Sequence, residues 1–525
     1  MIKPTLIFPS VFRNPLENYC NESITKFWDV MNCVCSPIGD QRNEPNGSIL
    51  ALASSLIKSG FEPDVCDFNV ISCKKYPENP SMFSIEDYDH FFDTENFKDK
   101  LLCLSIITAN EPQARYCAQL LRKKGNRLPI IVGGQFPTLY HLHFTSESWK
   151  DFCNVIIIGE GDNILCLIAE IINQYKSKPP KILNQILLKK LQENKDYQVH
   201  INQFNQLIIE VVTPPDISQL PSPSYELIRL KPNDLIYRIW TTRGCGEDCI
   251  FCTPAICYRR SVRYRSIEKV KEDIQKGIEI GAQYFAFGDL TFFYDEDHSR
   301  EILKMVKTNF STELNFWCQT RIDRITDPNI DLLKESGCSQ IAIGIETFHE
   351  SSLKKVSKHQ CSKTIITALE CIKNFGLSTE GYVVIGLPEE TVESTFESIR
   401  VIHDLLRENL LTVINPSIFV PFPGLKVPDS VEIINKNYNN YVMNVFHDHC
   451  AFPVYRTDKM SAYEIRALWE FLLAGAIEAV EKRKWEISTS SLTKEANCVI
   501  GKTKLLQSRR DERVPVFFLN FLPNS

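Results

Sequence analysis

Three cysteines lie close together near the middle of the chain, in the stretch TTRGCGEDCIFC. Cys245, Cys249 and Cys252 have the spacing C-x3-C-x2-C. Because the chain has 19 cysteines in 525 residues, chance would produce this spacing in about 2–3% of such sequences. Three thiolates on one short loop can hold three irons of a 4Fe–4S cluster and leave the fourth iron open to a substrate. A structural zinc site that adds Cys257 as a fourth thiolate is the alternative.

Alternating strands and helices surround this cysteine loop. Six apolar strand candidates lie at 236–241, 284–288, 315–319, 340–345, 380–385 and 412–419, separated by helical patterns. Strand–helix units of about 30 residues are typical of a partial or complete parallel barrel, whose chemistry lies at the carboxyl ends of the strands. The cysteine loop follows the first of these strands, so we expect it at that end of the barrel.

An earlier block of alternating elements occupies the first 175 residues. Its strand candidates are 5–8, 65–70, 101–107, 130–133 and 154–158, and most of their residues are apolar. Such strands predict a doubly wound parallel sheet with helices on both faces. Ligands of such sheets bind outside the carboxyl ends of the strands. That edge carries Thr108, Gly133, Gly134, Gln135, Gly159, Glu160 and Gly161.

The sequence therefore predicts an α/β protein with several parts. We expect a Rossmann-like domain over 1–175, a Lys-, Pro- and Asn-rich linker over 176–234, the partial barrel over 235–428, and a mostly helical C-terminal domain over 429–525. The helical pattern of this last part is clearest at 463–484.

Composition and charge exclude several classes of protein. Lys and Arg total 59 and Asp and Glu total 65, a net charge of −6, which argues against a nucleic-acid partner. No apolar run reaches the roughly 18 residues that span a bilayer. The first ten residues, broken by Pro4 and Pro9, lack the apolar core of a signal peptide. We expect a cytoplasmic protein in which most other cysteines are small buried apolar residues.

The cysteine loop and the strand ends around it resemble the radical S-adenosyl-L-methionine (radical SAM) enzymes. In that family the open iron binds SAM, and the reduced cluster cleaves its sulfonium bond to give a 5′-deoxyadenosyl radical. The resemblance implies that Cys245, Cys249 and Cys252 hold the cluster. It also implies SAM contacts that follow the loop and the later strands. Phe251 would lie near the adenosyl group, Asp289 at the amino group, Arg321 at the carboxylate or ribose, Glu346 at the ribose or amino-acid part, and Gly386 under the adenine. Taken singly, Asp289 also suits a helix cap, Glu346 a solvated loop acid and Arg321 a surface ion pair.

The first domain resembles the cobalamin-binding domain of the B12-dependent branch of that family. The seven residues at its sheet edge would then contact cobalamin. The Asp-x-His-x-x-Gly pattern that supplies a cobalt ligand is absent, so we expect His141 and His143 to be surface or satisfied side chains. The resemblance implies methylation of an unactivated carbon, with SAM as both methyl source and radical source. It also implies a small-molecule or peptide substrate and an external electron donor of the flavodoxin or ferredoxin type.

Other functions are compatible with these motifs. A non-methylating radical rearrangement, cyclisation or oxidation, with or without cobalamin, would use the same barrel. A methylthiotransferase would need three further cysteines from the first domain, where Cys20, Cys33, Cys35, Cys66, Cys73 and Cys103 are available. A protein that only carries or senses cobalamin or an iron–sulfur cluster is a further alternative, but it would give Arg321, Glu346 and Gly386 at the later strand ends no role. The FHDHC stretch at 446–450 suits either a metal site or a solvated loop.

Overall fold

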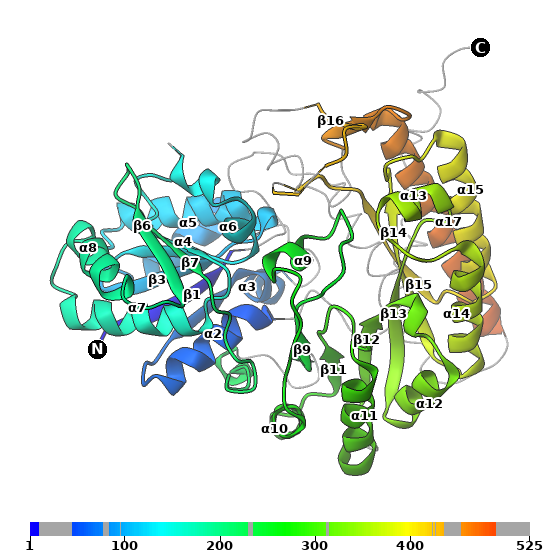
Figure 1. The fold of residues 1–525 in the computed structure, drawn as a ribbon, viewed down its shortest axis with the longest axis horizontal. Coiled ribbons are helices and arrows are strands. Elements are labelled where there is room, and N and C mark those ends of the chain that lie inside the picture. The colour runs from blue at the N-terminus through cyan, green and yellow to red at the C-terminus, as the bar shows by residue number, and fades with distance from the viewer. Residues whose placement is uncertain are drawn as a thin grey trace.

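The computed structural model describes residues 1–9, 45–76, 83–94, 96–146, 148–228, 235–310, 314–422, 424–425, 427–434 and 453–489. Figure 1 shows two α/β halves side by side, the first built from the N-terminal part of the chain and the second from the C-terminal part. Each half has its own parallel sheet and its own helices. The mixed α/β class predicted from the sequence is therefore confirmed.

The first half is built on a seven-stranded sheet with the order β2-β1-β3-β4-β5-β7-β6. All neighbouring strands are parallel except the antiparallel pair β6–β7. The strands are β1 (Lys3–Phe8), β2 (Asp64–Asp67), β3 (Lys100–Ser105), β4 (Ile130–Gly133), β5 (Val155–Ile158), β6 (Tyr197–Ile201) and β7 (Leu207–Val211). The helices are α2 (Gly47–Lys58), α3 (Phe68–Lys75), α4 (Ile85–Thr94), α5 (Glu111–Lys123), α6 (Gln135–Tyr140), α7 (Asp162–Tyr175) and α8 (Pro180–Leu191).

Alternate residues of these strands pack into two separate cores, one on each face of the sheet. Leu6 packs with Leu56 of α2 and Ile168 of α7, whereas Ile7 belongs to the opposite core, which includes Leu121 of α5. Because side chains alternate across a strand, apolar residues at every position require cover on both faces. This arrangement is the doubly wound sheet that the sequence predicted.

The stretch predicted as a linker, 176–234, contributes two strands to this sheet. β7 pairs with β5, and β6 pairs with β7. The polar residues that resembled a linker lie largely on α8 and on β6, whose strand is at the sheet edge. The turn between the two strands contains Asn205, with φ of +60°. The first half therefore extends to Val211, and a connecting segment follows it.

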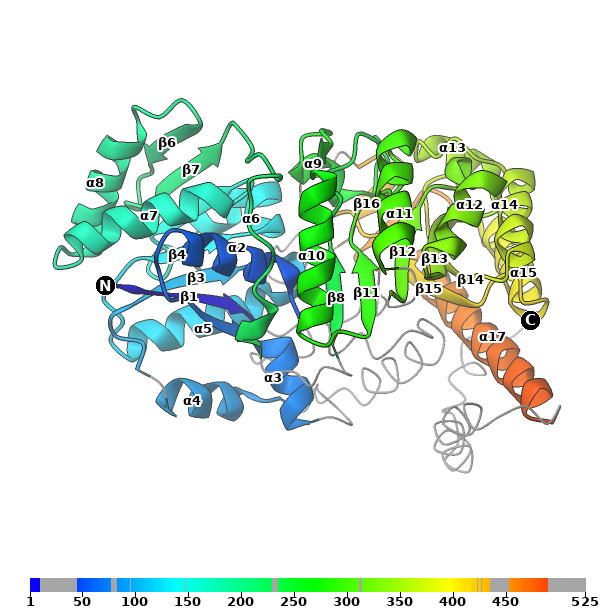
Figure 2. The ribbon, with the colours of Figure 1, turned by 90° about the horizontal axis from the view of Figure 1, so that it is seen from below.

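The second half contains a six-stranded, all-parallel sheet in which strands lie side by side in chain order. The strands are β8 (Ile236–Ile239), β11 (Tyr284–Phe287), β12 (Phe316–Thr320), β13 (Cys338–Glu346), β14 (Ser378–Ile385) and β15 (Val413–Ile418). Helices α10 (Ile267–Glu279), α11 (Glu296–Phe310), α12 (Asp327–Glu335), α14 (Ser362–Asn374) and α15 (Val392–Arg407) lie along its outer side (Figure 2). Sequential parallel order is that of a partial barrel, as predicted.

The described part of the C-terminal region is mostly helical and also contains a small sheet. α17 (Ala462–Thr489) packs against α15 and β15 through Trp469, Leu472 and Ala476. A small antiparallel pair, β16 (Val431–Ile433) and β17 (Tyr455–Thr457), precedes it and was not predicted. The FHDHC stretch at 446–450 lies outside the described residues. Within the ranges described, no helix combines the length and apolarity that crossing a membrane requires.

Candidate functional site

The cysteine loop lies at the carboxyl end of β8, between the two halves. Directly after β8, the short strand β9 (Thr242–Arg243) pairs with β10 (Arg263–Tyr264), and α9 (Thr253–Cys257) follows the loop. Gly244 has a φ of +104°, and a side chain there would collide with the carbonyl oxygen of Ser261. Only glycine can enter the loop in this conformation.

The three loop cysteines lie in a poorly solvated environment. Cys245 is buried, Cys249 and Cys252 are partly exposed, and the backbone N–H of Cys252 donates to the Cys249 carbonyl at 3.1 Å. Burial raises the pKa of Cys249 and raises that of Cys252 to about 11. At Cys249 and Cys252 the neutral thiol is therefore favoured until a metal displaces its proton.

The donor set fits an iron–sulfur cluster by its chemistry. Among the described residues, no group of three or more His, Cys, Asp or Glu side chains is close enough together to hold a metal ion in the present conformation. Cys257, the fourth ligand of the zinc alternative, instead has its sulfur 3.9 Å from the carbonyl oxygen of Gln135 in the first half. Three thiols on one loop, with the next cysteine turned to another partner, suit a three-thiolate cluster better than a four-thiolate zinc site.

Asp289, at the end of β11, holds the chain segment that leads into this loop. Its carboxylate accepts the backbone N–H groups of Thr241 and Thr242 at 2.8 and 2.5 Å, and both threonine hydroxyls at 2.9 Å. Burial raises its pKa to about 6. Because the side chain is buried and both oxygens are engaged, Asp289 does not present a free carboxylate to SAM. In this geometry Asp289 holds the segment ahead of the loop, and its contact with SAM stays a prediction.

Arg321 and Glu346 lie around Cys249, as strand-end placement predicted. Arg321 forms an ion pair of 2.9 Å with Glu247 of the cysteine loop. Glu346 ends β13 with a φ of +61°, a strained backbone conformation for a residue with a side chain. The charges of both residues act on the thiol of Cys249. The structure therefore brings these two candidates to the cysteine loop.

Lys358 is a further member of this group. Its Nζ lies 2.9 Å from Oε1 of Glu346, and its charge also acts on Cys249. The residue follows α13 (Glu350–Lys355) in the stretch KKVSKHQ. Nothing in that stretch distinguishes Lys358 from the surface lysines beside it, so no local pattern singles it out.

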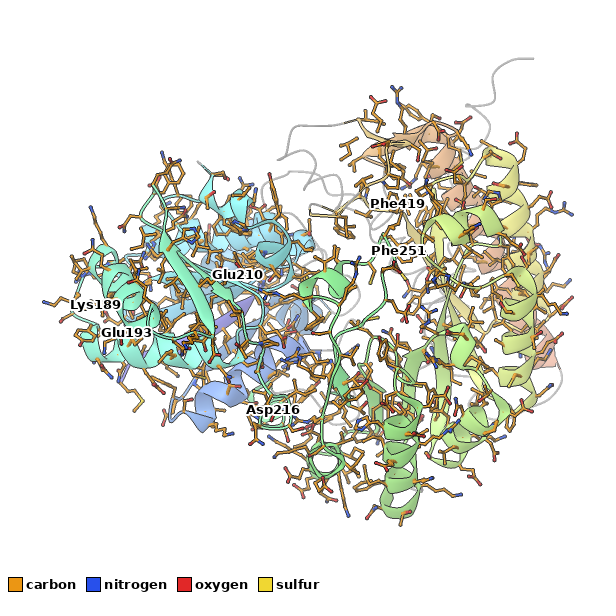
Figure 3. The ribbon with its side chains drawn as sticks, viewed as in Figure 1. Lys189, Glu193, Glu210, Asp216, Phe251 and Phe419 are labelled. Atoms are coloured by element: carbon orange, nitrogen blue, oxygen red, sulfur yellow. The ribbon has the colours of Figure 1, made fainter. Side chains whose placement is uncertain are left out.

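Gly386 and Phe251 occupy apolar positions near the same end of the barrel. Gly386 follows β14 with a φ of +82°. Its N–H donates to Glu390 at 3.0 Å, and its carbonyl accepts the hydroxyl of Tyr455 at 2.8 Å. Phe251 is partly buried against the core of the second half and is labelled between the two halves in Figure 3.

A cavity of about 380 Å³ separates the carboxyl edge of the first sheet from the cysteine loop. Six of the seven predicted edge residues line it, namely Gly133, Gly134, Gln135, Gly159, Glu160 and Gly161. Thr108 is buried and is not among the lining residues. From the second half, Trp240, Arg243 and Tyr258 complete the wall. Glycines at two strand ends leave backbone exposed to this cavity, which suits a flat macrocycle.

Two of these edge residues connect the halves. Gln135 donates from its amide nitrogen to the hydroxyl of Thr253 on α9, and Glu160 forms ion pairs with Arg243 and Arg263. Their polar groups are therefore engaged by the second half, which the sequence did not predict.

The two histidines near this edge differ in their environment. His143 is buried, and its Nε2 lies 2.8 Å from Oε1 of Glu111, so it is satisfied, as expected. His141 is partly exposed.

Comparisons with known proteins identify the second half. Residues 239–402 match the Radical SAM superfamily. An uncharacterized methyltransferase of Pyrococcus horikoshii is 22% identical over 63% of this chain and 69% of its own length. The bacteriochlorophyllide d C-12(1)-methyltransferase of Chlorobaculum tepidum is 25% identical over 58% of this chain and 60% of its own length, which is less than two thirds. The radical SAM methyltransferase TsrM of Kitasatospora setae, solved with cobalamin and a 4Fe–4S cluster, has a similar fold, with a TM-score of 0.55 at 14% identity over 82% of this chain and 80% of its own.

Proposed function

Because residues 239–402 form a radical SAM domain, this chain is a radical SAM enzyme, and we propose that it methylates an unactivated carbon with the help of cobalamin. One observation carries the proposal: the glycine-rich edge of the first sheet shares a single cavity with Gly244, just before the first loop cysteine, and with Pro254, Cys257 and Tyr258, just after the last. The names of the two methyltransferase relatives and the cobalamin bound by TsrM support it.

Each cofactor has a set of residues suited to hold it. Cys245, Cys249 and Cys252 would hold the cluster, and Arg321 and Glu346, with Phe251 and Gly386, would surround SAM. Gly133, Gly134, Gly159 and Gly161 would face cobalamin. When bound, the reduced cluster and SAM supply a 5′-deoxyadenosyl radical, and cobalamin supplies a methyl carrier.

The protein's own residues position and enclose these groups. Asp289 fixes Thr241 and Thr242 ahead of the cysteine loop. Arg321, through Glu247, holds the loop from the side of β12. A small-molecule or peptide substrate would enter from the cavity, and electrons would come from a flavodoxin- or ferredoxin-type protein. The reducing cytoplasm suits both the cluster and the free thiols of the described cysteines.

The methylthiotransferase alternative is less well supported by the first half. Cys66, Cys73 and Cys103 are buried in its core, and among the described residues they form no metal-binding group. Cys20, Cys33 and Cys35 lie outside the described residues.

The proposal is tested by anaerobic reconstitution. The protein is loaded with iron, sulfide and excess hydroxocobalamin, desalted, and analysed for metals and visible absorbance. We expect about four irons and one cobalt per chain, with the spectrum of cobalamin whose base is detached from cobalt. A variant with Cys245, Cys249 and Cys252 all changed to alanine should lose the iron and all SAM cleavage. Four irons without cobalt would refute the cobalamin-dependent function, and undiminished SAM cleavage in the triple variant would refute the assignment of the cluster.

A further inference from the structure

Two arginines face each other, one just ahead of the cysteine loop and one after α9, which follows the loop. Arg243 on β9 and Arg263 on β10 are register partners in a two-stranded antiparallel sheet. Their side chains are mostly buried, with 17% and 19% exposed. Like charges that are directly opposed across two strands destabilise the pair, and burial weakens screening by water. This small sheet therefore needs negative charge close to both guanidinium groups.

The first half supplies that charge from the end of β5 and the start of α7. Nη1 of Arg243 lies 2.9 Å from Oε2 of Glu160 and 2.9 Å from Oδ2 of Asp162. Nη2 of Arg263 pairs with the other oxygen of Glu160, Oε1. Two carboxylates thus neutralise two guanidinium groups, and a single carboxylate, Glu160, bridges both arginines.

The same strand is held from the opposite side by the barrel. Asp289 accepts the backbone N–H of Thr242, the residue before Arg243. Cys245 follows Arg243 by two positions, with the conformationally fixed Gly244 between them. The place of the first cluster ligand is therefore determined jointly by an acid of the barrel and two acids of the first half.

We propose that Glu160, Asp162, Arg243 and Arg263 form an interdomain clamp that positions the cysteine loop against the cavity. All but Arg263 also line that cavity. A ligand bound at the edge of the first sheet would then also restrain the cysteine loop. Because such coupling is reciprocal, an ordered cysteine loop would in turn strengthen the binding of that ligand. The clamp rests on the proposed function only for the identity of that ligand, cobalamin.

The test compares Glu160→Gln with a matched control. Glu160→Gln preserves the shape of the side chain and leaves two opposed arginines with one acid. The control is Glu210→Gln, because Glu210 on β7 pairs with Arg259 at 2.7 Å across the same two halves, but both side chains are about half exposed. Exposed ion pairs contribute little to stability, so the control should behave as the unmodified protein does.

Hydrogen exchange of the apoprotein gives a readout that does not depend on cobalamin. In Glu160→Gln, the amides of residues 244–252 should exchange about ten times faster or more, while those of β12 and β13 keep their rates. In the double variant Glu160→Gln/Arg263→Met, one of the two opposed charges is gone, so part of the protection from exchange should return. If Glu160 acted only as a stabilising contact, the second substitution would restore nothing. Unchanged exchange, equal acceleration throughout the chain, or a double variant worse than Glu160→Gln would overturn the clamp.

Cobalamin titration, followed by visible absorbance, gives the second readout. Glu160→Gln should weaken cobalamin binding by about 5- to 150-fold, and Glu210→Gln should not change it. If the unmodified protein retains no cobalamin, the proposed function fails, while the exchange measurements still decide whether the clamp exists. If the unmodified protein binds cobalamin and Glu160→Gln binds it equally well, the coupling is refuted.

Discussion

Lys358 meets Glu346 inside the protein, with 2.9 Å between Nζ and Oε1 and only 11% and 6% of the two side chains exposed. Burial by itself lowers the pKa of Lys358, but the charge and hydrogen bond of Glu346, together with the charge of Cys249, outweigh it and hold that pKa above its ordinary value. The pair therefore places an ammonium group and a carboxylate beside Cys249, where the open iron of a cluster and the amino-acid end of SAM would meet.

Changing Lys358 to methionine should weaken SAM binding strongly. The substitution keeps most of the side-chain volume but leaves Glu346 buried without its cation. A hydrogen bond to a charged group contributes about 1.5–3 kcal/mol, so the affinity for SAM should fall by about 10- to 150-fold. Equilibrium dialysis of the cluster-loaded protein measures this. Lys354→Met, on an exposed position of α13, is the control, and equal affinity in both variants would contradict the assignment.

Asp289 should tolerate asparagine much better than alanine. The Oδ1 atom accepts three of its four hydrogen bonds, and an amide oxygen can replace it there. Alanine instead leaves the buried N–H groups of Thr241 and Thr242 without partners, at a cost of about 1–3 kcal/mol each. After anaerobic reconstitution and desalting, Asp289→Ala should retain less iron per chain than Asp289→Asn. Equal iron contents would show that Asp289 does not position the loop.

The sequence predicted the parts of the site that depend on local pattern. Apolar strands and the C-x3-C-x2-C spacing are such patterns, and the structure places the strand ends near Arg321 and Glu346 around the loop they were expected to serve. The bond between Glu160 and Arg243 was missed because it joins residues that are distant in the sequence. Lys358 was missed because nothing in its local sequence distinguishes it from the surface lysines nearby. Local composition also misled. The residues of α8 and β6 are polar because they lie at an exposed edge of the sheet, and this polarity resembled that of a linker.

Gly386→Ala should destabilise the protein more than Gly376→Ala. Both glycines have positive φ, +82° and +72°, which costs about 1–2 kcal/mol for a residue with a side chain. At Gly376 a Cβ would only approach Nζ of Lys334 at 3.5 Å, whereas at Gly386 it would collide with the hydroxyl of Tyr455. Overpacking adds about 1–3 kcal/mol.

Urea unfolding of both glycine variants measures this difference. Combining Gly386→Ala with Tyr455→Phe should recover part of the loss, because the colliding oxygen is removed. Equal destabilisation at the two glycines would mean that Tyr455 does not brace the turn after β14.

Glu380 should make the free energy of unfolding depend on pH. It is buried within the second sheet, where the amide groups of Gln340 and Asn415 donate to it at 2.8 and 3.2 Å. Burial raises its pKa from 4.5 to about 7. Between these values the folded state holds a proton that the unfolded state has lost. The contribution of this residue to stability is therefore greatest below pH 4.5, falls as the pH rises to about 7, and is constant above it.

Changing Glu380 to glutamine removes this dependence while keeping the side chain's shape. One pKa unit corresponds to about 1.4 kcal/mol. Between pH 4.5 and pH 8 the free energy of unfolding of the unmodified protein should therefore fall by about 3 kcal/mol relative to that of the variant. The buried oxygen of Gln340, which has no partner in the structure, can accept the new amide N–H if its own amide group turns. Chemical unfolding at a series of pH values tests this, with the exposed Glu397→Gln as control. Parallel curves for the two variants would show that folding does not raise the pKa of Glu380.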